Sequence, residues 1–277
     1  MTSEMLDKID AQHPPSEGVL KHLAIIMDGN GRWASRRGKS ASHGHRAGVE
    51  VVRDVVKLCR DQGVEVLTLF AFSRENWQRP RAEVTALMTL FSAYLKKEIK
   101  KLHSDGIRVR FIGERSRFSA SLLKQMEYSE QLTRGNSDTT LVIAVDYGGQ
   151  NDIARAARML AEQVQRGELA PEQIDEQRIN AQMSLADLPP LDLCIRTAGE
   201  CRISNFLLWQ MAYAELYFSD TLWPDFCEAD MLAAIASFNN RQRNYGGRIL
   251  DQADSQPDEL FDEQWADNVG PIPAEAK

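Results

Sequence analysis

The sequence predicts an α/β protein, a single domain in which helices surround a central, mostly parallel sheet. Apolar segments of strand length alternate with segments of helical periodicity from residue 22 to about residue 245. This alternation is typical of parallel sheets, because a helix usually crosses over between two parallel strands. No repeat, low-complexity block or Pro/Gly-rich linker divides the middle of the 277 residues, so one shared core is expected.

The first predicted strand ends at Met27 and leads into the polar segment Asp-Gly-Asn-Gly-Arg at residues 28–32. A short apolar run bounded by glycine is typical of a strand that is covered on both faces. Its loop then lies at the carboxyl edge of the sheet, where ligands collect and where a following helix directs its free N–H groups. A carboxylate at Asp28 among glycines and Arg32 indicates a divalent cation shared with a phosphate, and Mg²⁺ suits such ligands. The segment also fits a simple tight turn, and it matches no nucleotide-binding fingerprint.

Hydrophobic periodicity predicts the remaining strands and the helices that cover them. The clearest helix, at residues 83–101, has an apolar stripe that fits either plain core packing or the wall of a ligand groove. Gly63 provides a stop for the helix before the second strand. Further helices are predicted at residues 48–62, 119–133, 149–166 and 172–183, and further strands at residues 64–72, 108–112, 141–146 and 191–195.

A second polar segment, Ser-Arg-Glu-Asn-Trp-Gln-Arg-Pro at residues 73–80, follows the second strand. Loops at the carboxyl ends of neighbouring parallel strands converge, so this segment is expected beside Asp28. Trp77 fits either a surface packing position or the wall of a site. A basic run fits either a solvated face or the rim of a phosphate site, and consists of Arg36, Arg37, Lys39, His43, His45 and Arg46.

A third polar segment follows the last predicted strand and contains Arg196, Arg202 and Ser204. Guanidinium groups present paired donors to phosphate oxygens, so these residues can bind a second diphosphate. Ion pairing with Asp192 or Glu200 is the alternative for each arginine. An apolar helix is expected after this loop. Two anion sites, an acid suited to Mg²⁺ and apolar helical surface together indicate a reaction that joins two diphosphates with apolar tails.

Composition restricts the ligand class and the compartment. The net charge of −7 lies in residues 251–277, which hold eight acids and one lysine, whereas residues 1–250 carry 32 acids and 32 bases. Local basic clusters therefore decide which anions bind, and no nucleic-acid partner is expected. The four cysteines lack disulfide or zinc spacing, and no segment fits a signal peptide or membrane span, so a soluble, cytoplasmic protein is expected. Residues 1–20 and 248–277 are expected to be disordered.

Three motifs together resemble those of the cis-prenyltransferases, the family that includes bacterial undecaprenyl diphosphate synthases. They are His-Leu-Ala-Ile-Ile-Met-Asp-Gly-Asn-Gly-Arg-Trp at residues 22–33, Phe-Ala-Phe-Ser-Arg-Glu-Asn-Trp-Gln-Arg-Pro at residues 70–80 and Ile-Arg-Thr-Ala-Gly-Glu-Cys-Arg-Ile-Ser-Asn-Phe-Leu-Leu-Trp-Gln at residues 195–210. The resemblance places a catalytic domain at residues 21–247. It implies a homodimer with a hydrophobic tunnel, with the helix at residues 83–101 as one wall, and at most peripheral membrane contact when product is released.

The resemblance also implies an activity. The enzyme would condense isopentenyl diphosphate with an allylic diphosphate such as farnesyl diphosphate, and would make a long cis-polyprenyl diphosphate such as undecaprenyl diphosphate, the lipid-carrier precursor for cell-wall glycan. The resemblance assigns catalysis to Asp28 and Asn76, with Asn76 taking part in proton removal, and it assigns Mg²⁺ binding to Asp28 and Glu215. Contacts with the primer and the reaction site fall to Gly29, Asn30, Gly31, Arg32, Trp33, His45, Ser73, Arg74, Glu75, Trp77 and Arg79. Contacts with isopentenyl diphosphate fall to Arg196, Arg202, Ile203 and Ser204.

Several positions depart from the family pattern. Ala41 stands where an arginine usually contacts the primer diphosphate, Ala198 replaces a glycine, and Cys201 replaces a histidine that often lies near the metal. Asp146 stands where an asparagine is common. Two alternatives therefore stay open: a paralogue that makes a shorter or irregular isoprenoid diphosphate, and a non-catalytic partner subunit. The residues assigned to catalysis are all present, which favours an active enzyme.

Overall fold

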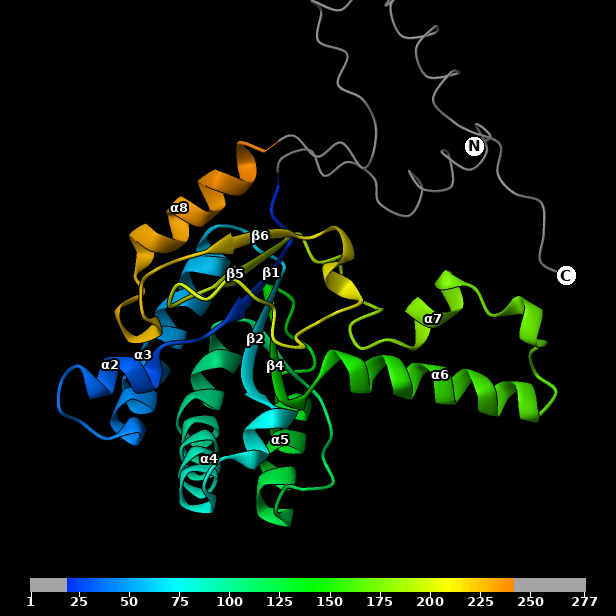
Figure 1. The fold of residues 1–277 in the computed structure, drawn as a ribbon, viewed down its shortest axis with the longest axis horizontal. Coiled ribbons are helices and arrows are strands. Elements are labelled where there is room, and N and C mark those ends of the chain that lie inside the picture. Colours follow the sequence, from blue (N-terminus) through cyan, green and yellow to red (C-terminus); the bar gives the residue numbers. More distant parts are fainter. Residues whose placement is uncertain (1–18, 242–277) are drawn as a thin grey trace, which may run out of the picture. The chain divides into compact units, whose positions relative to one another are not determined.

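The computed structural model describes residues 19–241, and its centre is a six-stranded sheet in which all neighbouring strands are parallel (Figure 1). The strand order β3-β4-β2-β1-β5-β6 places β1 between β2 and β5. The predicted α/β fold is confirmed. Disorder is predicted for residues 1–20 and 248–277, of which residues 1–18 and 248–277 lie outside the described residues, whereas Leu20 is buried in the core. The strands are β1 (His22–Ile26), β2 (Val66–Ser73), β3 (Ile107–Ile112), β4 (Thr139–Tyr147), β5 (Leu193–Arg196) and β6 (Glu215–Phe218).

Most helices begin and end within a few residues of the predicted positions, but α3 begins at Ala41 rather than at Gly48. Glycine at position 44 lets α3 approach α2 closely, because a Cβ there would come within 2.0 Å of the Asn30 carbonyl oxygen. The α-helices are α2 (Asn30–Ser35), α3 (Ala41–Asp61), α4 (Arg81–Ser104), α5 (Ala120–Leu132), α6 (Gly149–Gln165), α7 (Glu176–Gln182) and α8 (Glu228–Asn239). The 3-10 helices are η1 (Arg74–Gln78), η2 (Pro171–Gln173), η3 (Gln210–Tyr213) and η4 (Trp223–Asp225).

Apolar side chains pack against both faces of the sheet, as its parallel topology requires. Successive residues of a strand point to opposite faces: Leu23 and Ile25 of β1 enter one core cluster, and Ala24 and Ile26 enter the other. Helices α3, α4, α5 and α8 contribute to the first cluster, and residues 185–214 contribute to the second. Helices α6 and α7 lie side by side and extend away from the sheet (Figure 1). Within the described part of the chain, no helix is long and apolar enough to cross a membrane.

The apolar helix predicted after residue 204 is wrong. Ser204, Asn205 and Leu207 have φ angles of 48°, 62° and 41°, in the left-handed region that interrupts a right-handed helix. The chain instead forms the short helix η3 and then β6, which pairs with β5 at the edge of the sheet. Apolar composition misled the prediction because a buried irregular loop and a buried helix have similar residues.

Candidate active site

A cavity of about 800 Å³ lies at the carboxyl ends of β1 and β2, and its size and mixed lining are typical of ligand sites. The structure places residues from all three motifs in this one cavity. Its polar lining residues are Asp28, Asn30, His45, Ser73, Glu75, Asn76, Arg79, Gln150, Arg196, Arg202, Ser204 and Asn205. Its apolar lining residues include Val52, Leu69, Leu87, Met88, Leu90, Phe91, Ile143 and Val145.

Asp28 lies where the loops after β1 and β5 meet. Its Oδ2 accepts a hydrogen bond of 2.9 Å from Arg196 Nη2 and lies 3.6 Å from Arg32 Nη2. Its Oδ1 accepts the Gly29 N–H at 2.7 Å, and its own N–H donates to Thr197 Oγ1 at 2.9 Å. These contacts fix the carboxylate, and its side chain is still 32% exposed, so it can bind a further ligand.

Two neighbouring residues adopt left-handed conformations to bring the loops this close. Gly29 has a φ of 105°, and a Cβ there would lie 2.9 Å from the side chain of Leu222 and 3.0 Å from Ala198 Cβ. Ala198 itself has a φ of 75°, which costs a residue with a Cβ roughly 1–2 kcal/mol. The glycine that is usual in the family at position 198 therefore has a conformational reason, and this chain keeps the conformation without it.

Arg196 is almost fully buried, with 4% of its surface exposed. Besides Asp28, its guanidinium donates to Ser204 Oγ at 2.7 Å and to the Arg202 carbonyl oxygen. Arg196 therefore orients Asp28 and shapes the loop after β5 at the same time. The sequence predicted a diphosphate contact for this residue, with ion pairing to Asp192 or Glu200 as the alternative, but neither the pair with Asp28 nor the burial of the side chain, which is a tertiary property.

Glu200 connects the two arginine-bearing loops. Its carboxylate lies 3.4 Å from Arg32 Nη1 and accepts a hydrogen bond from Arg202. The ion pairing that the sequence left open as an alternative is thus present for Arg202. The Arg202 side chain is 61% exposed, and an ion pair this exposed contributes little stability, so Arg202 can exchange Glu200 for a phosphate at low cost.

Helix η1 places Asn76 at the cavity wall. Its side-chain Oδ1 accepts the Ser73 N–H at 3.1 Å and so fixes the amide at the start of the turn. At the end of η1, Arg79 pairs with Glu83 at 3.0 Å. Burial and the positive charge of Arg79 lower the pKa of His45, against the opposing effect of Glu83, so this ring is neutral at neutral pH.

Asn205 is a cavity residue that the sequence analysis missed. Its Nδ2 donates to Glu75 Oε1 at 2.8 Å, and its Oδ1 accepts the Gln150 N–H at 2.8 Å. It thereby joins η1, the start of α6 and the loop after β5. Burial by itself would raise the pKa of Glu75. The hydrogen bond from Asn205 and other nearby polar groups have a larger effect in the opposite direction, so the pKa of this carboxyl is lowered. The signal for Asn205 was its position directly after Ser204 in the third motif.

Some predicted site residues do not line the cavity. Trp77 faces the core, where its ring centroid lies 5.3 Å from that of Phe72 and 6.2 Å from that of Phe118. Trp33 donates its indole N–H to Asp225 at 2.6 Å. Both rings are large apolar groups that gain more from packing than from a polar cavity. Other predicted residues outside the cavity lining are Gly29, Gly31, Arg32, Arg74, Ile203 and Glu215.

Glu215 lies away from the other predicted Mg²⁺ ligand. It begins β6 and is level with Leu193 of β5 and Leu23 of β1, whereas Asp28 follows the far end of β1. Its carboxylate is ion-paired with Arg241. The two carboxylates are therefore not brought together within this chain, because the register of the parallel strands separates them along the sheet.

The surroundings of Asp28 fit a hard cation that shares its coordination with a substrate. Within residues 19–241, no three His, Cys, Asp or Glu side chains are grouped so that they could hold a metal ion. Mg²⁺ keeps several waters and is commonly held by one or two carboxylates plus substrate phosphates, so one exposed carboxylate is a sufficient protein contribution. Arg32 and Arg196 lie beside it and provide positive charge for such phosphates.

The fold and the cavity together define an α/β protein with a cavity that is lined by polar and charged residues at the edge of its sheet and by apolar residues of its helices. Residues 26–246 match the family model described as putative undecaprenyl diphosphate synthase. The chain belongs to this prenyltransferase family.

Curated relatives cover most of the chain. It is 54% identical over 233 residues to the ditrans,polycis-undecaprenyl-diphosphate synthase ((2E,6E)-farnesyl-diphosphate specific) of Escherichia coli strain K12, a match that covers 84% of this chain and 92% of the relative. An enzyme of the same description from Pseudomonas syringae pv. tomato is 55% identical over 241 residues, with 87% and 95% covered.

Two solved structures of prenyl diphosphate synthases share the fold at lower sequence identity. Lavandulyl diphosphate synthase from Lavandula x intermedia, in complex with dimethylallyl diphosphate, has a TM-score of 0.80 and 37% identity, with 83% of this chain and 100% of that chain covered. A probable undecaprenyl diphosphate synthase from Campylobacter jejuni has a TM-score of 0.69 and 32% identity, with 82% and 98% covered.

Proposed function

We propose that this protein elongates an allylic diphosphate with isopentenyl diphosphate, with farnesyl diphosphate as primer and undecaprenyl diphosphate as product. The observation that carries the proposal is the cavity, in which Asp28 and three arginines share one space with apolar side chains of α3 and α4. Such a cavity suits a substrate with a charged head and a growing apolar tail, because burial of apolar surface is favourable. The curated relatives named for this reaction support it.

The polar groups of the cavity are suited to the charge that develops when the allylic C–O bond breaks. Arg196 lines the cavity and Arg32 lies just outside its lining, both beside Asp28 Oδ2, and donors fixed before the reaction lower its barrier. Mg²⁺, held by Asp28, would supply further charge neutralisation at the departing diphosphate. The double bond of isopentenyl diphosphate attacks C1 of the primer, the diphosphate leaves, and a proton is lost as the new double bond forms. Asn76 is the residue that the family resemblance assigns to that proton.

The proposal includes a homodimer and transient contact with a membrane surface when product leaves. Tyr213 and Phe218 expose 55% and 38% of their surface beside and on the edge strand β6. Apolar side chains on an exposed strand edge are typical of protein interfaces. Analytical ultracentrifugation checks the stoichiometry, and monomeric protein at working concentration would contradict the dimer.

Product analysis tests the proposed reaction. Purified protein with Mg²⁺, labelled isopentenyl diphosphate and geranyl, farnesyl or geranylgeranyl diphosphate is expected to give undecaprenyl diphosphate by mass spectrometry, with farnesyl diphosphate used best. Short or irregular products would instead favour the paralogue. No product from any primer, with product formed only when a second synthase is added, would favour a non-catalytic subunit.

Ala41→Arg is expected to tighten primer binding. Ala41 lies at the exposed start of α3. Of the cations that could compensate, Lys39 contacts His43 at 3.0 Å and Arg37 pairs with Asp225 at 3.3 Å, which leaves Arg36 as the rival for the primer phosphate. A new guanidinium contact with a charged oxygen is worth about 1.5–3 kcal/mol, or roughly ten- to a hundredfold in affinity. The Kd of farnesyl diphosphate is measured for this variant and for Ala41→Gln at one ionic strength. An unchanged or weaker Kd for the arginine variant would show that no contact is vacant.

A further inference from the structure

Asp146 occupies an irregular position at the end of β4. Phe72 of β2 pairs with Val145, but the next residue, Ser73, pairs with Tyr147, so Asp146 is an extra residue in the strand. Its φ is 48°, a left-handed value that Asp and Asn tolerate better than most residues. Bulges of this kind often occur next to active sites, where they redirect a side chain.

The side chain redirected by this bulge is a buried carboxylate. Asp146 is 0% exposed, and within residues 19–241 neither of its carboxylate oxygens makes a hydrogen bond. Trp77 Nε1 is also buried without a hydrogen-bond partner in the same part of the chain. A buried polar group without a partner is costly, so an acceptor and a donor left unpaired near each other need a joint explanation.

Several groups from η1 and from the turn between β3 and α5 act on the pKa of Asp146. Burial raises the pKa of Asp146, and Glu114 adds to this effect. The indole N–H of Trp77 and the positive charges of Arg117 and Arg74 act in the opposite direction. The indole N–H and the carboxylate lie outside hydrogen-bonding geometry, and Arg117 lies near both groups.

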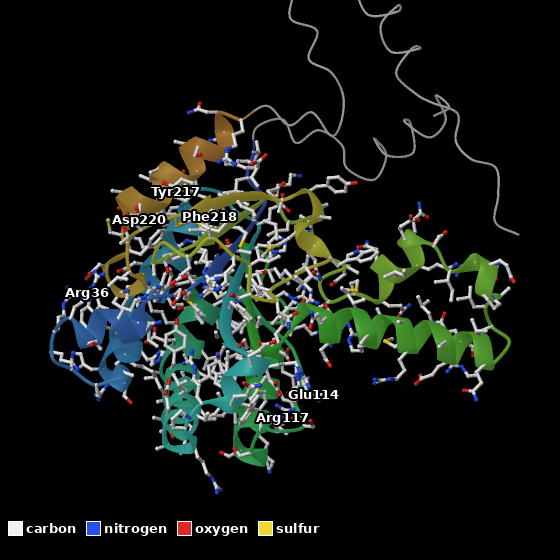
Figure 2. The ribbon with its side chains drawn as sticks, viewed as in Figure 1. Arg36, Glu114, Arg117, Tyr217, Phe218 and Asp220 are labelled. Atoms are coloured by element: carbon white, nitrogen blue, oxygen red, sulfur yellow. The ribbon has the colours of Figure 1, made fainter. Side chains whose placement is uncertain are left out.

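The turn between β3 and α5 is built to hold Arg117 at the same place. Arg117 Nε lies 3.8 Å from Asp146 Oδ2, and its guanidinium carbon lies 5.7 Å from the centre of the Trp77 ring. The Glu114 N–H donates to the Asp146 carbonyl oxygen at 3.1 Å. Gly113 permits this approach, because a Cβ there would come within 2.0 Å of the Val145 carbonyl oxygen. Glu114 and Arg117 are labelled in this turn in Figure 2.

We propose that Asp146 is a positioning residue for Asn76: its carboxylate holds Arg117 over the Trp77 ring and attracts the unpaired Trp77 indole N–H, and so fixes the η1 turn that presents Asn76 to the cavity. Asp146 does not line the cavity, so it acts through Trp77 and not on substrate. Trp77 and Asn76 are adjacent in η1, and the Asn76 amide accepts the Ser73 N–H at the start of this turn. This role rests on the proposed function of Asn76 in the condensation.

A double-mutant cycle tests the coupling. Asp146→Ala and Trp77→Phe are each expected to lower kcat by about tenfold, the effect of losing roughly one buried polar interaction, with little change in the KM of either substrate. Because both variants remove the same interaction, the double variant is expected to lose no more than the worse single variant. Asp146→Asn is expected to recover most of the activity, since its amide oxygen can accept the same N–H and asparagine tolerates the left-handed φ.

Trp209→Phe is the matched control, because Trp209 donates its indole N–H to Asn180 and has no part in this cluster. Its effect should simply multiply with that of Asp146→Ala. Unchanged kcat in folded Asp146→Ala, or multiplicative losses at Asp146 and Trp77, would overturn the proposal.

A readout without substrate separates this proposal from the proposed function. In ¹⁵N-labelled protein, the Trp77 indole N–H resonance, assigned with Trp77→Phe, should shift more in Asp146→Asn than the resonance of Trp209. An equal or smaller shift would contradict the anchoring contact even if condensation is active. Should the protein make no prenyl product, a selective shift would still support the contact, and the reaction assigned to it would be wrong.

Discussion

Asp28→Asn is expected to lower kcat for condensation by about 10²- to 10³-fold while the fold stays intact. Asparagine has the same shape, but its single amide oxygen can accept only one of the two donors that Asp28 binds, the Gly29 N–H at Oδ1 or Arg196 Nη2 at Oδ2, so one of these contacts is lost while the backbone of the loop is kept. What it removes is the negative charge that holds a divalent cation beside the departing diphosphate. Steady-state kinetics over a series of Mg²⁺ concentrations, together with thermal unfolding, measures both consequences.

Glu200→Gln is the control for Asp28→Asn. It also removes an acid near Arg32, but that acid pairs with arginines and is not the proposed ligand. It should leave the Mg²⁺ dependence of kcat unchanged. Near-normal turnover of Asp28→Asn with an unaltered Mg²⁺ requirement would show that Asp28 is not the Mg²⁺ ligand.

Arg196→Ala is expected to have an effect of similar size, with both a lower kcat and a higher KM for isopentenyl diphosphate. Removing one partner of a buried charge pair costs about 3–5 kcal/mol, which corresponds to roughly 10²- to 10³-fold. The loss is large because Arg196 orients Asp28 and also holds Ser204 and the Arg202 carbonyl oxygen. Arg196→Lys should recover little, since an ammonium group cannot reproduce the planar array of donors.

Substitutions of Arg202 and Arg32 provide the comparison for Arg196→Ala. Arg202→Ala should mainly raise the KM for isopentenyl diphosphate, because its side chain is 61% exposed and supports no buried group. Arg32→Ala should mainly raise the KM for the primer, because Arg32 follows β1 and Arg202 follows β5. If all three variants changed only the primer KM, the division into two diphosphate sites would be wrong.

Much of the site could be predicted because its residues lie in three short segments that follow strands. A run of apolar residues predicts each strand, and parallel strands have their carboxyl ends at the same edge of the sheet. These two local rules are enough to expect Asp28, Asn76 and Arg202 near one another, and the structure places all three in one cavity. Asn205 was missed because its importance comes from bonds to Glu75 and Gln150, which are distant in sequence.

The sequence by itself determined the α/β class, the order of the elements as far as β5 and the polar segments after the strands, since periodicity and motif spacing are properties of neighbouring residues. Only the tertiary structure decided which of those polar side chains face the cavity. The register of β1, β5 and β6 separates Glu215 from Asp28. Residues with left-handed φ angles prevent a helix from forming before β6. The bulge in β4 turned Asp146 toward Trp77 and Arg117. Register, bulges and burial depend on contacts between distant segments, and no local pattern contains that information.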